Sequence, residues 1–148
     1  MPAQLTISTN MIAPALVLVL WSLVMLVWMV ALRIPAIAKL KLDADQTRGG
    51  RGQDLDRILP REVNWPAHNY AHLMEQPTIF YATVLSIALL GAGSPLNVGL
   101  AWGYVALRII HSIWQATINH INVRGSLFLL SSLLLLVLAA NGLVCALQ

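Results

Sequence analysis

Charged residues and cysteine are both scarce in this sequence. Only 10% of its 148 residues are Asp, Glu, Lys or Arg, whereas a soluble domain carries about 25%. The single cysteine, Cys145, excludes an internal disulfide and is better explained by packing than by reactivity. The net charge of +3 does not indicate a nucleic-acid partner, and we expect none. Hydrophobic residues make up 58% of the chain, a composition typical of membrane proteins.

Four apolar stretches are long enough to cross a bilayer, which takes roughly 20 residues of helix. They cover about residues 11–33, 67–91, 97–119 and 125–147 and leave no room for a soluble domain. We therefore predict one all-α integral membrane domain over residues 1–148, a transmembrane four-helix bundle in contact with lipid. The first stretch follows no basic residue and contains no small-residue cleavage site, so we expect it to be retained as a span.

The distribution of basic residues predicts the orientation of the chain. Seven of the nine lie between the first two stretches: Arg33, Lys39, Lys41, Arg48, Arg51, Arg57 and Arg61. Residues 1–32 and the 92–96 turn contain none. By the positive-inside rule, the 34–66 loop is cytoplasmic and both termini lie on the other side of the membrane. Arg124, in the third connection, agrees with this orientation.

Two of the apolar stretches carry polar residues at helical spacing. They are His68, His72 and Glu75 in the second stretch, and Arg108, His111, Gln115 and Asn119 in the third. Spacings of three and four residues place each set on one side of its helix. Ionisable groups in hydrocarbon are costly unless they are paired or hydrated, so we expect both sets to face the bundle interior. The predicted orientation brings them together toward the cytoplasmic side.

Two explanations of these polar faces stay open. In the first, Glu75 and Arg108 form a buried ion pair that only fixes helix register, while His72 and His111 satisfy neighbouring groups. In the second, the same groups form a site that opens to the cytoplasm. Their concentration on one side of the membrane favours the second explanation. In both, Arg108 is the expected partner of Glu75.

Arg124 stands near the start of the fourth predicted helix, where unpaired backbone N–H groups and the helix dipole favour an anion. A guanidinium at this place would lower the pKa of a bound thiol from about 8.5 toward neutrality and so produce thiolate. The hydroxyl of Ser126 would donate a further hydrogen bond. Snorkelling of Arg124 to lipid headgroups explains its position equally well.

These features together resemble the MAPEG family, the membrane-associated proteins in eicosanoid and glutathione metabolism. The resemblance rests on the four spans with outward termini, the segment Glu75–Phe80 (EQPTIF), the Arg108–Ile109–Ile110–His111 motif, and Arg124 ahead of the last helix. It implies a homotrimer of four-helix subunits. It also implies that glutathione, as co-substrate, binds between neighbouring subunits near the cytoplasmic face.

The resemblance also implies roles for individual residues. The implied glutathione-binding residues are Glu75, Arg108 and His111, with Arg33 as a looser match. We add His72 and Gln115, which stand at positions where the family carries other residues. Arg124 is the residue that would polarise the thiol, with Ser126 beside it as a second catalytic candidate. The activity that follows is that of a glutathione-dependent transferase or peroxidase acting on lipophilic electrophiles from the bilayer.

Several positions depart from the family pattern. His68 and His72 stand where members that use glutathione carry arginine and asparagine, and Gln115 replaces a tyrosine. These departures favour an alternative, a non-catalytic protein of the same fold that serves assembly or ligand binding. They mark the chain as a divergent member. We expect a bacterial origin, and in that case the protein lies in the inner membrane.

A metal site is the third hypothesis for the polar residues. Histidine and carboxylate side chains from two helices could supply zinc or iron ligands: His68, His72, Glu75 and His111. However, Arg108 lies one helical turn from His111 and would repel a cation. We therefore expect no metal.

Overall fold

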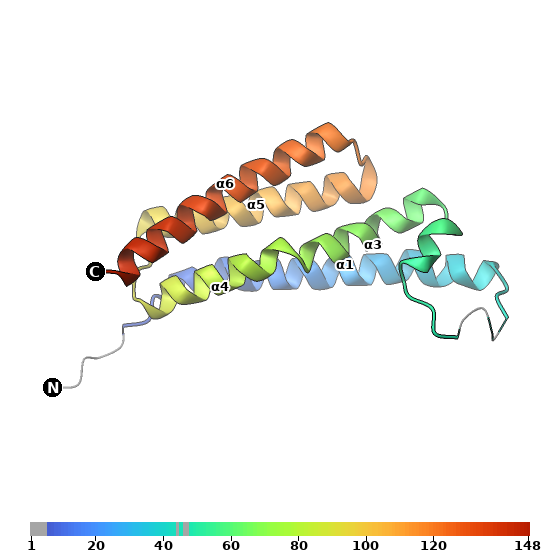
Figure 1. Ribbon diagram of the computed structural model, residues 1–148, viewed down its shortest axis with the longest axis horizontal. Helices are drawn as coiled ribbons and strands as arrows, with labels where there is room; N and C mark the ends of the chain where they lie inside the picture. Colours follow the sequence, from blue (N-terminus) through green and yellow to red (C-terminus); the bar gives the residue numbers. More distant parts are fainter. Residues whose placement is uncertain (1–5, 44, 46–47) are drawn as a thin grey trace.

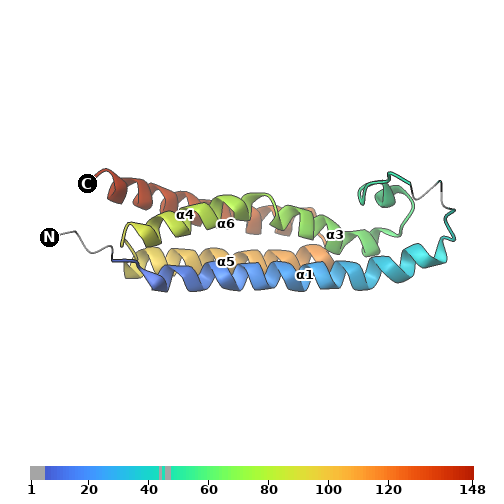
Figure 2. The same ribbon diagram turned by 90° about the horizontal axis from the view of Figure 1, so that it is seen from below.

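The computed structural model describes residues 6–43, 45 and 48–148, and all regular structure in them is helical. The elements, in chain order, are η1 (Thr9–Met11), α1 (Ile12–Lys39), η2 (Asp54–Arg57), α3 (Arg61–Leu73), α4 (Gln76–Leu89), α5 (Pro95–Thr117) and α6 (Ile121–Ala146). The helices run along one long axis (Figure 1). The described segment before α1, the C-terminus and the α4–α5 turn lie at one end of the molecule, here called the terminal end (Figure 1, Figure 2). The 40–60 loop and the α5–α6 turn lie at the other, the loop end.

Three helices are long and apolar enough to cross a membrane: Thr9–Lys39, Pro95–Thr117 and Ile121–Ala146. They correspond to the first, third and fourth predicted spans, and they confirm the all-α class. The predicted loop 34–66 is too long, because α1 continues to Lys39 and α3 already begins at Arg61. Only residues 40–60 connect the two helices.

The second predicted span is not one helix. It consists of α3 and α4, which follow each other along one line and are separated by a break at Met74 and Glu75 (Figure 1). Pro77 explains the break, because it has no N–H to donate to the carbonyl of Leu73 and its ring would collide with that carbonyl in a continuous helix. The prediction of an unbroken helix over 67–91 was therefore wrong.

Helix α5 packs against α1, α3 and α6. In its centre the rings of Phe80 and Tyr104 stack at 4.3 Å between centroids, and both side chains are fully buried. Large apolar side chains also cover the outside of the bundle: Leu20, Leu136 and Leu143 are each more than 60% exposed. Such a surface fits contact with lipid or with other subunits.

The terminal end is closed by the segment before α1. The N–H of Ser8 donates to the carbonyl of Ala88 at 2.9 Å, and the side chain of Asn10 donates to the carbonyl of Gly93 at 3.0 Å. A Cβ atom at Gly93 would lie 2.5 Å from atoms of both Ser8 and Asn10, so only glycine permits this approach. Gly91 ends α4 with a φ of +67°, a left-handed conformation that glycine adopts without strain.

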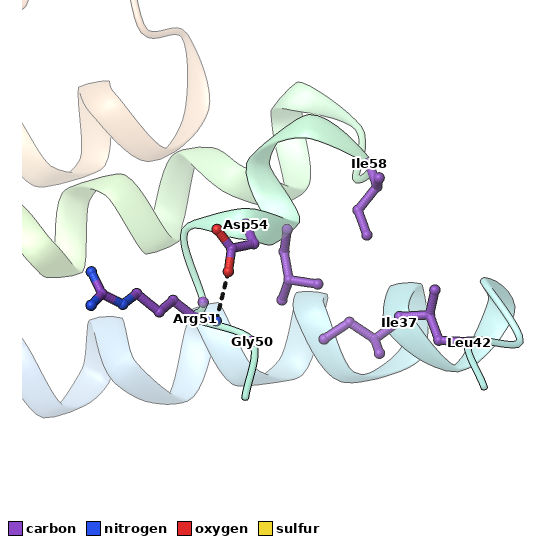
Figure 3. A pocket seen from close by; sticks show the side chains of 8 residues that line it. Ile37, Leu42, Gly50, Arg51, Asp54 and Ile58 are labelled. Carbon is purple, nitrogen blue, oxygen red and sulfur yellow. Dashed lines mark hydrogen bonds between the residues drawn. The ribbon is translucent and has the colours of Figure 1, made fainter. Parts of the chain in front are cut away.

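The 40–60 loop folds back onto the end of α1. Together they enclose an apolar hollow of about 410 Å³ whose walls include Ile37, Leu42 and Ile58 (Figure 3). The backbone N–H of Arg51 donates to a carboxylate oxygen of Asp54 at 2.8 Å, which closes the turn before η2. The loop thus has a specific fold over its described residues.

Candidate functional site

One face of α5 buries a row of polar side chains at the loop end. Arg108, His111, Ser112 and Gln115 are each exposed by 5% or less. Helical spacing predicted the inward position of all but Ser112. Among the described residues, several of their polar atoms lack a hydrogen-bond partner: Arg108 Nε and Nη1, His111 Nδ1, Ser112 Oγ and Gln115 Oε1. Buried polar atoms without partners are rare in folded proteins, so these donors and acceptors are available to water or to a ligand.

Arg108 stabilises the break between α3 and α4. In a continuous helix the carbonyl of His72 would accept a hydrogen bond from the N–H of Gln76. The chain turns before Gln76, and Nη2 of Arg108 donates to the His72 carbonyl instead, at 3.1 Å. The same nitrogen lies 3.4 Å from Nδ1 of the His72 ring. The guanidinium of Arg108, which belongs to a helix long and apolar enough to cross a membrane, therefore replaces a missing backbone donor.

Glu75 is not the partner of Arg108, so the predicted ion pair is wrong. Glu75 occupies the break with φ −90° and ψ −95°, and its side chain is exposed on the surface of the subunit. No ion pair joins it to Arg108 in the part of the chain that the structure describes. The break turns the carboxylate away from the face that a continuous helix would have given it.

Three rings lie together beside Arg108. His72 stacks on His111 with 5.0 Å between ring centroids, and Phe128 of α6 lies 5.2 Å from His72. The guanidinium carbon of Arg108 lies 5.7 Å from the centre of the Phe128 ring, within the range of a cation–π contact. Sequence reasoning missed Phe128. The sequence contained a signal for it, because Phe128 lies four residues after Arg124 and therefore on the same face of α6.

A pocket of about 210 Å³ opens next to these rings. Its lining comes from α3, α5 and the first turns of α6: His72, His111, Ile121, Arg124, Gly125 and Phe128. Arg124 is the fourth residue of α6, close to the helix N-terminus where an anion is favoured. Among the described residues, the lining contains a guanidinium and two imidazoles but no carboxylate. The pocket can therefore accept an anionic group against an aromatic and aliphatic wall.

Arg124 and Ser126 lie on different sides of α6. One guanidinium nitrogen of Arg124 donates to the side-chain oxygen of Asn119 at 2.8 Å. Ser126 is exposed, does not line the pocket, and donates to the backbone carbonyl of Asn122 at 3.0 Å. Two residues along a helix correspond to about 200° of rotation, which explains the separation. Gly125 takes the place in the pocket lining that Ser126 was expected to fill.

Arg33 and His68 belong to a second cluster, which holds the loop. Arg33 donates to the carbonyl of Gly52 at 2.9 Å, to a carboxylate oxygen of Asp56 at 2.7 Å and to the side chain of Asn64 at 2.9 Å. The other carboxylate oxygen of Asp56 lies 2.9 Å from Nε2 of His68. We call these contacts the loop clasp. His68 therefore does not share a site with His72 within one chain.

The proposed metal ligands are not brought together. His68 contacts Asp56, Glu75 is exposed, and only His72 and His111 are neighbours. Within the described residues, no group of three His, Cys, Asp or Glu side chains is placed to hold a metal ion. The basic and aromatic pocket beside Arg124 is the better candidate site.

Comparison with known proteins agrees with this picture of a membrane bundle. No curated protein and no solved structure matches the chain. The MAPEG family profile matches residues 11–144, which is most of the sequence. This match supports, in general terms, a role at a membrane related to glutathione or eicosanoid metabolism. The helices of spanning length, their order and the extent of the match together establish that the chain belongs to the MAPEG family.

Proposed function

We propose that this chain is a membrane glutathione-dependent transferase or peroxidase that acts on lipophilic electrophiles, with Arg124 stabilising the glutathione thiolate. The observation that carries the proposal is the pocket lined by His72, His111, Arg124 and Phe128. It offers cationic and polar nitrogen atoms and no carboxylate. A thiolate is the anionic group that a glutathione-related protein has to stabilise.

The chain's own groups account for ionisation of the thiol. Arg124 adds a positive charge to the N-terminus of α6, whose first N–H groups are free to bind an anion. When the S–H bond breaks, the proton passes to solvent and the electron pair stays on sulfur beside the guanidinium. In a transferase reaction the sulfur then bonds to the electrophilic carbon, and the displaced electron pair leaves with the departing group. With a hydroperoxide, the sulfur attacks the outer oxygen, the O–O bond breaks, and the alkoxide takes a proton from solvent and leaves as the alcohol. The sulfenic acid formed on sulfur then reacts with the thiol of a second glutathione to give glutathione disulfide and water.

The size of the pocket supports binding between subunits. At about 210 Å³ it is smaller than the roughly 300–1,000 Å³ of most small-molecule sites, so it can hold the cysteinyl part of glutathione but not the whole tripeptide. In the homotrimer that we propose, a neighbouring subunit supplies the remaining surface. The exposed carboxylate of Glu75 is available to bind an ammonium group there, while Arg33 is already engaged in the loop clasp.

Lipophilic substrates fit the apolar side of the same pocket. Phe128 forms part of its wall, and Ile121 at its mouth is 69% exposed. An electrophile dissolved in the bilayer would reach the sulfur along this side without crossing water.

The test is the ionisation of glutathione bound to the purified protein. Wild type with millimolar glutathione is expected to show thiolate absorbance near 240 nm at neutral pH, and Arg124→Ala to lose it. A fall of about two units in thiol pKa requires roughly 2.7 kcal/mol, within reach of one arginine and a helix terminus. Arg57→Ala, an exposed arginine of the loop, is the matched control and should retain the signal. Binding of glutathione without a lowered thiol pKa would refute the catalytic role.

A second candidate function is non-catalytic binding or assembly by the same fold. It is favoured by His68, which occupies the family's arginine position and is held by Asp56 rather than free for a ligand. Isothermal titration calorimetry with millimolar glutathione separates the two candidates. Absence of heat at that concentration, in protein that is folded and oligomeric, would favour the non-catalytic function.

We also propose that the loop end is cytoplasmic and both termini lie outside. Cys145 at the end of α6 is exposed and is a native reporter of the terminal end. In intact cells, a membrane-impermeant maleimide should label Cys145. In the variant Cys145→Ser with Gly50→Cys, the same reagent should label only after lysis, and a Cβ at position 50 meets no atom within 4 Å. The reverse labelling pattern would invert the orientation.

A further inference from the structure

The turn between α5 and α6 reverses the chain through one residue in the left-handed region. Asn119 has a φ of +57°, and its N–H donates to the carbonyl of Trp114 at 2.8 Å. Glycine is the usual residue for this conformation, since a Cβ atom makes it costly, and asparagine is the next most tolerant. At the equivalent reversal after α4 the chain does use glycine, at Gly91 with a φ of +67°. Backbone geometry alone therefore does not explain asparagine at position 119.

The side chain of Asn119 supplies the missing reason. Its amide oxygen accepts the hydrogen bond from Arg124 at 2.8 Å, across the turn and five residues along the chain. Among the described residues this is the one hydrogen bond that the Arg124 guanidinium makes. A long arginine side chain loses considerable rotamer freedom when it is fixed, so an anchoring acceptor decides where its charge lies. Glycine at position 119 would form the same turn and leave Arg124 unanchored.

The chemical type of the acceptor matters as much as its position. A carboxylate at position 119 would form an ion pair with Arg124 and offset the positive charge that a bound anion needs. A neutral amide oxygen fixes the guanidinium and leaves its charge in place. The remaining N–H groups of Arg124 are then free for a ligand in the pocket that Arg124 lines. Asparagine is the residue that combines left-handed backbone, reach and neutrality.

We infer that Asn119 is a positioning residue that holds Arg124 at the pocket so that its guanidinium faces the sulfur of bound glutathione. The identity of the ligand in this inference rests on the proposed function, whereas the contact between Asn119 and Arg124 does not depend on it. Asn119 does not touch the reacting atoms; it acts through Arg124. The thiol proton leaves to solvent, and the electron pair left on sulfur is stabilised by the oriented guanidinium.

Two substitutions separate the role of the backbone from that of the side chain. Asn119→Gly keeps the left-handed turn and removes only the acceptor, so the thermal midpoint of the apoprotein should not fall. Asn119→Asp keeps an acceptor and adds a charge that competes with the thiolate. Lys41→Gly is the matched control, because Lys41 is the other non-glycine residue described with a positive φ, at +48°, and lies in the loop.

The first readout does not require glutathione. Phenylglyoxal modifies accessible arginines, and mass spectrometry of the α6 peptide reports the rate at Arg124. Loss of a charge-assisted hydrogen bond of about 1.5 kcal/mol corresponds to a roughly tenfold change in equilibrium, so we expect modification several-fold faster in Asn119→Gly and unchanged in Lys41→Gly. Equal rates in wild type and Asn119→Gly would overturn the positioning role, whatever the protein binds.

The second readout is the pH titration of thiolate absorbance with bound glutathione. We expect the apparent thiol pKa to rise by about one unit in Asn119→Gly and further in Asn119→Asp. The affinity for S-methylglutathione, which has no ionisable thiol, should change by less than about threefold. An unchanged thiol pKa in Asn119→Gly would refute the inference while leaving the proposed function intact. If wild type itself ionises no thiol, the proposed function fails and the phenylglyoxal rates alone decide the role of Asn119.

Discussion

At each end of the bundle the chain turns back through a residue with left-handed backbone, Gly91 at one end and Asn119 at the other. Different kinds of contact close the two turns. At the terminal end, Gly91 and Gly93 let backbone approach backbone, and the segment before α1 seals the turn with main-chain and short side-chain hydrogen bonds. At the loop end, Asn119, Arg124 and Arg108 make the corresponding contacts with long polar side chains. The turn closed by backbone is built from uncharged groups, whereas the turn closed by side chains presents the guanidinium of Arg124 to a pocket. The difference locates the candidate site at the loop end.

The largest expected effect on stability is at the loop end. Arg108→Leu leaves the His72 carbonyl without a donor at membrane depth, and we expect a loss of about 3 kcal/mol in unfolding free energy measured in detergent. Arg108→Lys should recover part of it, since a donor remains. Glu75→Gln is the control and should change stability by less than about 0.5 kcal/mol, with additive effects in the double variant. If the double variant instead recovered stability, this would indicate an ion pair between Glu75 and Arg108, contrary to the structure.

At the terminal end the sensitive change is one added methyl group. In Gly91→Ala the new Cβ would lie 2.6 Å from the carbonyl oxygen of Thr6 in a left-handed backbone, and we expect a loss of about 2 kcal/mol. Gly99→Ala in α5 is the matched control, because a Cβ there meets nothing within 4 Å, and it should be neutral or stabilising. Thermal unfolding of the two variants checks this. Equal midpoints would mean that the terminal end is not closed by backbone contact.

The loop clasp is a weaker attachment than either turn. Asp56→Asn removes the charge that Arg33 and His68 share, and we expect local opening to become about tenfold more frequent, which corresponds to about 1.4 kcal/mol. Limited proteolysis within residues 48–53 should accelerate by that factor, while the global thermal midpoint moves little. Asp54→Asn is the control, because among the described residues the Asp54 side chain accepts a hydrogen bond only from the nearby Arg51 N–H. Similar acceleration in both variants would argue against a specific clasp.

The smallest expected effect is at Ser126. Because its hydroxyl is directed to the Asn122 carbonyl on the outer side of α6, Ser126→Ala should leave the thiol pKa of bound glutathione unchanged within about 0.2 units. The thermal midpoint should also stay the same. A clear rise of that thiol pKa would show that α6 rotates or frays when glutathione binds.

The sequence predicted three helices of spanning length, because apolar length decides them, but not the break in the second predicted span. It also predicted the inward face of α5, because Arg108, His111 and Gln115 follow helical spacing. It failed at Glu75, where the same spacing rule was applied across the break before Pro77, although the proline was visible. Arg33 was assigned to glutathione through the family resemblance. Its contacts with Gly52 and Asp56 could not be predicted, because they depend on how the loop folds. The left-handed backbone of Asn119 and the ring stack of His72 and His111 required coordinates, since no local pattern encodes them.

The break between α3 and α4 has a consequence for biogenesis. With 13 and 14 residues, α3 and α4 rise only about 20 Å each, so neither half alone crosses the roughly 30 Å of hydrocarbon. In the four-span topology predicted from the sequence, they enter the membrane as a unit, with the His72 carbonyl still lacking a donor. That donor, Arg108, is synthesised 36 residues later, a delay of a few seconds at about 5–20 residues per second. During this interval the nascent chain carries an unfinished transmembrane segment that only the arrival of α5 completes.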